Sequence, residues 1–203
     1  MDEIGLFPLP LVLVPGEQAP LHVFEPRYKE LIGECVDRDG EFGLVLADEE
    51  GVRSIGTRAS VVEVLERFPD GRMNVVVEGH DRFRVVEMTT GRSFATAAVD
   101  ALEDETDAPT ADERAACLAA YDRVVEAADT EVDELDRGSD TLTFEIVARI
   151  DLGTEVKQTL LETRSERERV VRLAGLLEGA AEAVAREREI RERATSNGRV
   201  EAL

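Results

Sequence analysis

The sequence predicts an α+β protein whose first part is a small antiparallel barrel or sandwich with one packed helix. Its second part is predicted to be a helical bundle that ends in a long helix. Three observations carry this prediction. Prolines interrupt the apolar N-terminal run, short apolar runs alternate with turn residues as far as residue 102, and apolar residues then recur at helical spacing. The boundary falls in the charged segment 103–109, which gives predicted parts of 1–104 and 105–203.

The opening apolar run is expected to be extended, because it contains Pro8, Pro10, Pro15 and Pro20. Proline removes a backbone donor and crowds the preceding turn, so a helix cannot pass through this spacing. We predict a strand at 9–14, a turn at Pro15-Gly16 and a strand at 21–24. Pro26 suits the first position of a helix, and the apolar spacing that follows predicts a helix over 26–38.

The next segments are predicted to be short strands. Apolar or alternating runs place strands at 42–47, 60–67, 73–78, 82–88 and 94–102, with a loop or edge strand at 52–57. The sequence Pro69-Asp70-Gly71 is typical of a hairpin turn. Near-regular spacing of this kind favours a small barrel or sandwich.

The second half shows helical signals. Thr110 and Glu113 have the spacing of a capping box, and the helix they begin is predicted to end near residues 137–138. A short helix follows Ser139 or Asp140, and another begins at residues 153–154. A second capping box, at 165–168, begins the long helix, and the tail from residue 197 is expected to fray.

Acidic residues dominate the charge. The chain has 45 Asp and Glu against 24 Lys and Arg, a formal net charge of −21, and its only lysines are Lys29 and Lys157. This composition resembles that of proteins from salt-loving archaea, where molar salt screens self-repulsion; an acidic mesophilic protein is the alternative. No apolar run is long enough for a membrane span, and the acidic N-terminus does not resemble a secretory signal. We expect a cytoplasmic protein that does not bind membranes.

Two motifs carry a family resemblance. The first comprises Leu6-Phe7-Pro8-Leu9, Pro15-Gly16 and Phe24-Glu25-Pro26-Arg27-Tyr28, and the second is the stretch from Gly79 to Phe83 that includes Arg82. Together with a weaker match at 157–162, they closely resemble the Lon protease N-terminal domain, also called the Lon substrate-binding domain. The resemblance covers roughly residues 4–185.

This resemblance implies a β-barrel of the PUA-like type and a stand-alone substrate-binding domain without ATPase or protease modules. It implies a non-catalytic protein that binds unfolded or degron-bearing polypeptides, or that docks on a partner protease or chaperone. A nucleic-acid-binding or small-ligand-binding module on the same barrel is the alternative. The late arginines alternate with glutamates, which is typical of a solvated helix and makes nucleic acid an unlikely partner. The sequence leaves the oligomeric state open.

No catalytic, cofactor or metal site is predicted. The sequence contains no phosphate-binding loop of the Walker type, and neither lysine lies near a candidate nucleophilic serine. Its two histidines and two cysteines lack the spacing of zinc ligands. Cys35 and Cys117 are expected to be buried free thiols, with a disulfide as the alternative.

The matched motif residues are expected to be mostly structural. Glu25, Arg27 and Tyr28 are predicted to fix the joint between strand and helix, and Phe24 is predicted to join the core. The set is Phe7, Pro8, Leu9, Pro15, Gly16, Phe24, Glu25, Pro26, Arg27, Tyr28, Gly79, Arg82 and Phe83. Client binding would use apolar residues that stay exposed, for which the candidates are Pro8, Pro10, Phe68 and Phe94.

Overall fold

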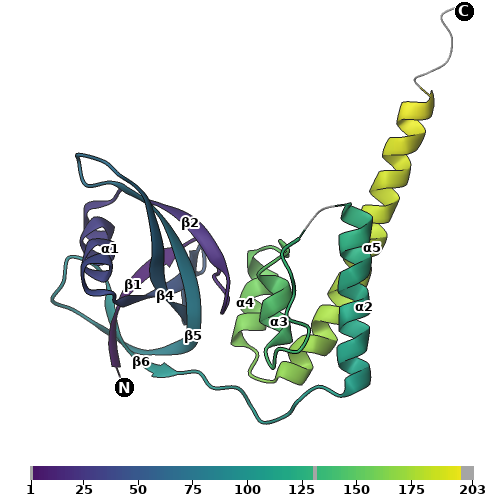
Figure 1. Ribbon diagram of the computed structural model, residues 1–203. Coiled ribbons are helices and arrows are strands. Elements are labelled where there is room, and N and C mark those ends of the chain that lie inside the picture. The colour runs from purple at the N-terminus through teal and green to yellow at the C-terminus, as the bar shows by residue number, and fades with distance from the viewer. Residues whose placement is uncertain (1, 130–131, 198–203) are drawn as a thin grey trace, which may run out of the picture. The chain divides into compact units, whose positions relative to one another are not determined.

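The computed structural model describes residues 2–129 and 132–197, including side chains as far as Arg186 and that of Ile190. The strands are β1 (Asp2–Leu9), β2 (Gln18–Val23), β3 (Glu41–Asp48), β4 (Gly51–Arg67), β5 (Met73–Thr89) and β6 (Thr96–Ala101). The helices are α1 (Pro26–Arg38), α2 (Ala111–Ala128), α3 (Leu142–Val147), α4 (Thr154–Glu162) and α5 (Glu166–Asn197). The six strands, with α1 between β2 and β3, precede the other four helices of the described chain, so the predicted α+β class is confirmed (Figure 1).

Five of the strands close into a barrel. The strand order is β2-β5-β4-β3-β1-β6, and a further pairing of β5 with β6 closes the sheet. The pairing of β1 with β3 is parallel and the others are antiparallel. Strand β2 pairs with β5 and lies at the end of this order. A closed sheet removes most free edges, which leaves only the segments outside the barrel open to a partner.

The strand predicted at residues 9–14 is wrong, because β1 ends at Leu9 and residues 10–17 form a loop. Pro8 pairs with Val45 of β3, beyond the residues of β1 that pair with β6. A proline fits there because no neighbouring strand requires its missing N–H. The loop still contributes Val12, Leu13 and Val14 to the core. The remaining strands match the prediction, except that β4 and β5 each run unbroken for 17 residues.

Helix α1 covers the main hydrophobic core of the barrel. Its bounds are as predicted, with Pro26 at the first turn and Asp39 ending it in the left-handed conformation. Tyr28, Leu31 and Ile32 pack into a cluster with residues of the loop and of β3 and β5. A second cluster lies around Phe83, between β1, β3 and β6.

The two sequence motifs meet in space. Gly16 N donates a hydrogen bond to Gly79 O at 2.8 Å, and Gly79 N donates to Glu17 O at 2.9 Å. Gly16 has φ +76°, which favours glycine. At Gly79 a Cβ atom would lie 2.4 Å from Val14 O. Glycine is therefore required at both positions, for conformation at the first and for space at the second.

We expect Gly79→Ala to lower the free energy of unfolding by about 3 kcal/mol, because the added carbon meets backbone rather than a movable side chain. Denaturant unfolding measures this. The matched control is Gly175→Ala within α5, where no atom would lie within 4 Å of the new Cβ. It should raise stability by about 0.5–1 kcal/mol. Equal effects of the two changes would show that the space around Gly79 does not require glycine.

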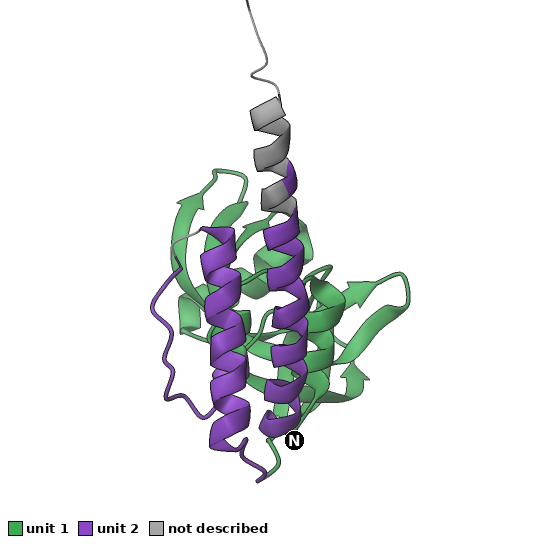
Figure 2. Ribbon diagram, turned by 90° about the vertical axis from the view of Figure 1, so that its right-hand side faces the viewer, with its two compact units in different colours: residues 1–105, 144–164 green, residues 106–143, 165–203 purple. Residues whose placement is uncertain are grey.

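The chain divides into two compact units (Figure 2). Unit 1 comprises 1–105 and 144–164, and unit 2 comprises 106–143 and 165–203. The sequence placed 144–164 in the helical half, whereas the contacts place α4 and most of α3 with the strands. Lys157 forms an ion pair with Glu17, and Gln158 Nε2 donates to Ile55 O at 3.2 Å. These polar contacts hold α4 on unit 1.

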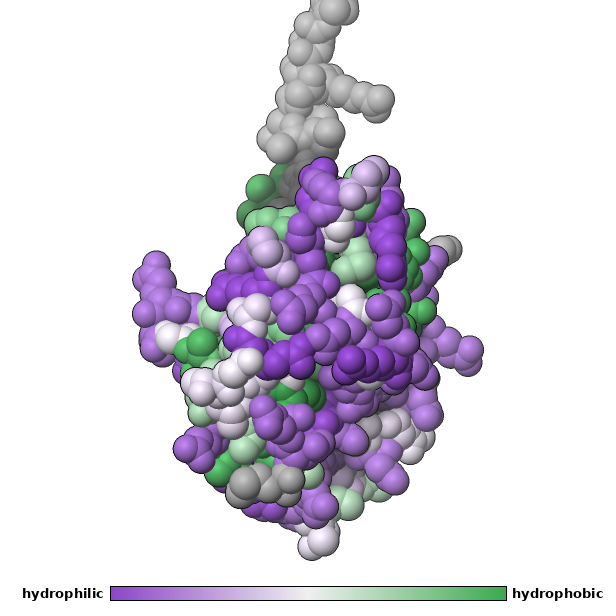
Figure 3. Space-filling view, turned by 90° about the vertical axis from the view of Figure 1, so that its left-hand side faces the viewer, coloured by the Kyte–Doolittle hydropathy of each residue, from purple (hydrophilic) through white to green (hydrophobic). Residues whose placement is uncertain are grey.

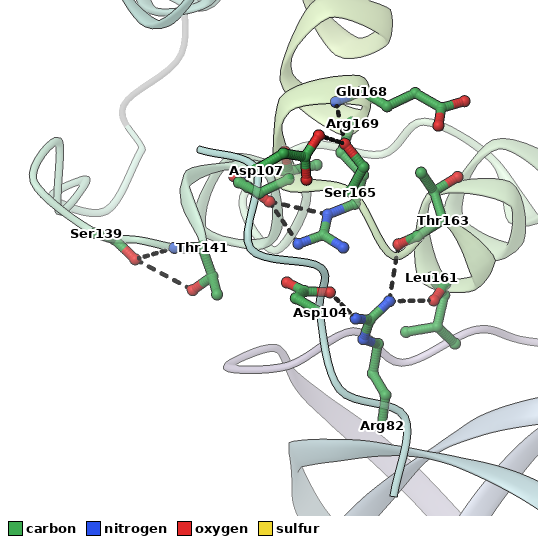
Figure 4. A network of polar contacts seen from close by, with 12 residues as sticks. Arg82, Asp104, Asp107, Ser139, Thr141, Leu161, Thr163, Ser165, Glu168 and Arg169 are labelled. Atoms are coloured by element: carbon green, nitrogen blue, oxygen red, sulfur yellow. Dashed lines mark hydrogen bonds and ion pairs between the residues drawn. The ribbon is translucent and has the colours of Figure 1, made fainter. Parts of the chain in front are cut away.

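The side chain of Arg82, from the second motif, contacts three other segments of unit 1. Its guanidinium donates to Leu161 O at 2.7 Å and Thr163 O at 2.9 Å, and it pairs with Asp104 (Figure 4). It also lies over the Phe144 ring, 5.3 Å from the centroid. The side chain is only 4% exposed. Its five donors in a rigid fork suit several acceptors at once.

Unit 2 has its own buried arginine. Arg169 donates to Glu166 Oε2 at 2.9 and 2.6 Å, and Glu166 Oε1 accepts from Thr143 N at 2.9 Å. Ser165 Oγ donates to Asp107 Oδ2 at 2.6 Å and accepts from Glu168 N at 3.0 Å. This cluster fixes the start of α5 to the segments at 107 and 143.

Helix α2 begins as predicted and ends earlier than predicted. Thr110 and Glu113 form the complete capping box. The helix ends at Ala128, where Asp129 adopts the left-handed conformation with φ 51°, and not near residue 137. The predicted fraying of the tail concerns residues 197–203, of which 198–203 lie outside the described chain.

Candidate functional site

Part of the sheet projects beyond the closed barrel. Residues 61–67 of β4 lie past the last pairing of β4 with β3, which joins Glu41 to Ser60. Within the described chain they pair with β5 alone, which in turn pairs with β2. We call residues 18–24 and 61–78 the extension. In the extension the outer edges of β2 and of residues 61–67 of β4 have no strand partner among the described residues.

Exposed apolar side chains occur on the extension. Phe24 is 58% exposed and Leu65 is 54% exposed, and Val62 and Val64 are also exposed. Single exposed apolar residues are common, whereas several on one structural element favour an interaction site. Figure 3 shows hydrophobic areas between hydrophilic side chains on one side of the molecule.

Three aromatic rings form a cluster on the extension. The His22 ring stacks on Phe24 with centroids 5.8 Å apart and meets Phe68 edge-on at 6.3 Å. His22 Nδ1 lies 2.6 Å from Asn74 Oδ1, which fixes the imidazole orientation. The Arg72 guanidinium lies 4.9 Å from the centroid of the Phe68 ring. The cluster is therefore held in place and offers flat apolar surface to a partner.

Both open edges oppose the addition of a further strand. Gly79 N donates to Glu17 O, and bonded positions alternate along an antiparallel pair. Pro20 therefore lies at a position that faces away from β5, where it offers no donor. On β4 the register with β5 shifts twice between Val61 and Glu66. Such bulges and charged residues protect edges from pairing, so side chains are the better means of recognition here.

The structure distributes the predicted client-binding residues unevenly. Pro10 is exposed in the loop after β1, and Pro8 is half-buried within β1. Phe68 is half-buried in the aromatic cluster. Phe94 is only 7% exposed and packs in the core beneath α1. Only Phe68 belongs to the extension.

The motif residues around the start of α1 form a local joint. Arg27 Nη2 lies 2.9 Å from Glu25 Oε2, and the Arg27 guanidinium lies 4.5 Å from the centroid of the Tyr28 ring. Tyr28 is buried against Phe7, with ring centroids 4.2 Å apart. Burial raises the pKa of Tyr28. These contacts orient the start of the helix, with Tyr28 buried and the Arg27 side chain 52% exposed.

Phe24 was predicted to join the core, and this is wrong. Side chains alternate between the faces of a strand, and the preceding Val23 is buried. That alternation is the signal that could have placed Phe24 outside. Val62, Val64 and Leu65 were not named as candidates, because the strand predicted at 60–67 was assigned to the barrel or sandwich. Nothing in the local pattern shows that β3 begins opposite Ser60, so that residues 61–67 have no β3 partner.

The described residues include no metal-binding cluster and no activated thiol. No group of three or more His, Cys, Asp or Glu that could hold a metal occurs among them. Cys35 and Cys117 are buried and free, as predicted. Burial raises the pKa of each thiol to about 11, so neither is a reactive thiolate at neutral pH. The helices of the described chain include none that is long and apolar enough to cross a membrane.

Comparison with known protein families identifies the family of this chain. Residues 3–179 match the model of the ATP-dependent protease La (LON) substrate-binding domain. The chain belongs to this family, which confirms the resemblance seen in the two motifs. Membership supports a substrate-binding, non-catalytic role.

Individual relatives show the same family similarity. Lon protease 2 of Myxococcus xanthus is 32% identical over 75% of this chain, and Lon protease of Escherichia coli K12 is 27% identical over 94%. The chain spans 20% and 26% of these proteins. A Lon N-terminal domain protein from Xanthomonas campestris has a similar structure, with TM-score 0.67 and 22% identity. That match covers 86% of this chain and 98% of the other.

Proposed function

We propose that this protein is a non-catalytic receptor that holds unfolded or degron-bearing polypeptides through apolar side chains of the extension. The observation that carries the proposal is the exposure of Phe24 beside Phe68 and His22, in a domain of the substrate-binding family. The bound chain would be passed to, or presented by, a protease or chaperone. A cytoplasmic location fits this role.

Recognition of a polypeptide through apolar contacts is compatible with the strongly acidic composition of this chain. With a net charge of −21 the protein repels acidic partners at low salt. At molar ionic strength the Debye length falls to about 3 Å, so charge pairs are screened while apolar contacts persist. Aromatic side chains dominate binding energy in many interfaces because they bury large areas with little loss of entropy. Phe24 is therefore the expected hot spot.

We expect Phe24→Ala combined with Leu65→Ala to weaken the binding of an apolar peptide by about tenfold or more. Fluorescence anisotropy in about 2 M KCl measures this. The probe is a fluorescein-labelled peptide rich in Leu, Val and Phe, and its counterpart carries Ser and Asn instead. The control is Val86→Ala combined with Met88→Ala, whose side chains are similarly exposed, at 48% and 53%, on β5 beyond the extension.

Each result has a distinct meaning. Loss of binding in the first variant alone supports the receptor at the extension. Equal loss in both variants, or equal affinity for the polar peptide, contradicts it. A labelled single-stranded RNA serves as a third probe, and binding of RNA alone would favour the nucleic-acid alternative on the same barrel.

A further inference from the structure

The turn between β4 and β5, residues 68–72, carries Phe68 of the aromatic cluster. Gly71 N donates to Phe68 O at 2.9 Å, and Phe68 N donates to Arg72 O at 2.9 Å. Gly71 has φ +83°, as in hairpins where a type I turn is followed by a left-handed residue. Neither of these bonds uses the carbonyl of Asp70, so that oxygen is open to a donor from outside the turn.

Lys29 of α1 supplies this donor. Its Nζ donates to Asp70 O at 2.9 Å, across 41 positions of the sequence. A Cβ added at Gly71 would lie 3.7 Å from Lys29 Cδ, so the aliphatic stem also lies close to the turn. Because the acceptor is a neutral carbonyl, molar salt screens this bond less than it screens an ion pair.

The contacts continue from Asp70 to Phe68 through Arg72. Arg72 N donates to Asp70 Oδ1 at 3.2 Å, and Arg72 Nε donates to Asp70 Oδ2 at 2.7 Å. The backbone N–H of Arg72 lowers the pKa of the Asp70 carboxyl below its usual value, so this group stays ionised at neutral pH. The guanidinium held in this way lies 4.9 Å from the centroid of the Phe68 ring.

Phe68 is the last step before the expected hot spot. It meets His22 edge-on, and His22 stacks on Phe24. Phe24 lies past the last paired residue of β2, which is Val23, so the neighbouring rings have a large share in orienting its side chain. A continuous series of contacts thus joins α1 to an exposed ring of the extension.

We propose that Lys29 is a positioning residue of the client site, which holds the turn so that Phe68 and Phe24 stay oriented to receive an apolar side chain. The inference rests on the proposed receptor function and adds control from α1, outside the surface that touches the client. Side chains that are already ordered lose less conformational freedom on association. Exposed contacts add little to global stability, so the effect should fall on client affinity rather than on unfolding.

Lys29→Met keeps an aliphatic stem and removes the donor. We expect it to weaken binding of the apolar peptide about three- to tenfold, measured by fluorescence anisotropy in about 2 M KCl. Lys29→Arg keeps a cationic donor and should retain most of the affinity. The control is Arg38→Met in the last turn of α1, where the side chain is 76% exposed. It should leave the affinity unchanged.

Two further measurements locate the effect in the turn. Exchange of the Gly71 amide hydrogen should accelerate severalfold in Lys29→Met and not in Arg38→Met, because the unanchored turn opens more often. The denaturant midpoint should be the same in both variants. Asp70→Ala should weaken peptide binding to a similar extent, because Arg72 then loses both carboxylate acceptors.

A double-mutant cycle with Phe68→Ala tests whether Lys29 acts through the aromatic cluster. Once the Phe68 ring is absent, Lys29→Met should cause no further loss of affinity. Losses that simply add would show that Lys29 affects binding elsewhere, which would overturn the positioning role. A general structural defect would persist in the Phe68→Ala background, so the cycle separates the two explanations.

The outcomes distinguish this inference from the proposed function. Peptide binding that Lys29→Met leaves unchanged overturns the positioning role and leaves the receptor at the extension intact. Equal loss in Lys29→Met and Arg38→Met also overturns it, because any positive charge on α1 would then suffice. Equal loss in Lys29→Met and Lys29→Arg contradicts the role of the donor. Absence of peptide binding by the unaltered protein overturns both proposals.

Discussion

Arg82→Ala is expected to lower the free energy of unfolding of unit 1 by about 3–5 kcal/mol, the usual effect of removing one partner of a buried ion pair. The change removes the Arg82 ion pair from Asp104 and the hydrogen bonds that Arg82 donates to Leu161 O and Thr163 O. Because these carbonyls belong to the end of α4, amide hydrogen exchange in residues 154–164 should accelerate more than exchange in β3. Denaturant unfolding and exchange measured together test this.

Arg84→Ala is the matched control, since Arg84 is exposed on the same strand. Its effect should stay within about 0.5 kcal/mol. Arg82→Lys keeps the charge but not the planar fork, so it should recover only part of the loss. Full recovery by lysine would mean that charge alone, and not the set of directed hydrogen bonds, stabilises this region.

Arg169→Met should have a comparable effect on unit 2. Arg169 is fully buried and Glu166 is nearly so, and removal of one charge leaves the other without compensation, which costs about 3–5 kcal/mol. The double variant with Glu166→Gln should recover much of the loss, because paired charges replaced together cost less than one alone. Arg172→Ala, an exposed position on α5, is the control.

The chain provides its own probes for these measurements. It contains no Trp and two Tyr, of which Tyr28 lies in unit 1 and Tyr121 in unit 2. Replacing either tyrosine with Phe leaves a fluorophore that reports one unit. Loss of the Tyr121 signal at lower denaturant in Arg169→Met, with the Tyr28 transition unchanged, is the expected result. A parallel shift of both transitions would contradict this expectation, because it would show that the two units unfold together.

The sequence predicts local structure well where one residue decides the conformation. Pro26 fixes the start of α1, and Thr110 with Glu113 fixes the start of α2. The end of α2 was misplaced because Asp129 is not a residue that usually ends helices in the left-handed conformation, a position that favours glycine. The end of β1 was misplaced because buried loop residues such as Leu13 are as apolar as strand residues.

The candidate site was harder to predict, because exposure depends on distant pairings. Phe94 and Phe24 are both aromatic and both adjoin strands, yet one lines a pocket and the other faces solvent. The difference arises from α1, which covers Phe94, and from the position of Phe24 past the last residue of β2. Arg82 was recognised as a motif residue, but its acceptors lie about 80 positions further along the chain.

The division of the chain has a consequence for its synthesis. The polypeptide passes between the two units at 105–106, 143–144 and 164–165. During translation all six strands emerge before residue 105, yet Arg82 must wait for the carbonyls of Leu161 and Thr163. Until then a nascent barrel holds a guanidinium without these acceptors. Completion of the first unit is thus delayed until all of α2, α3 and α4 have left the ribosome.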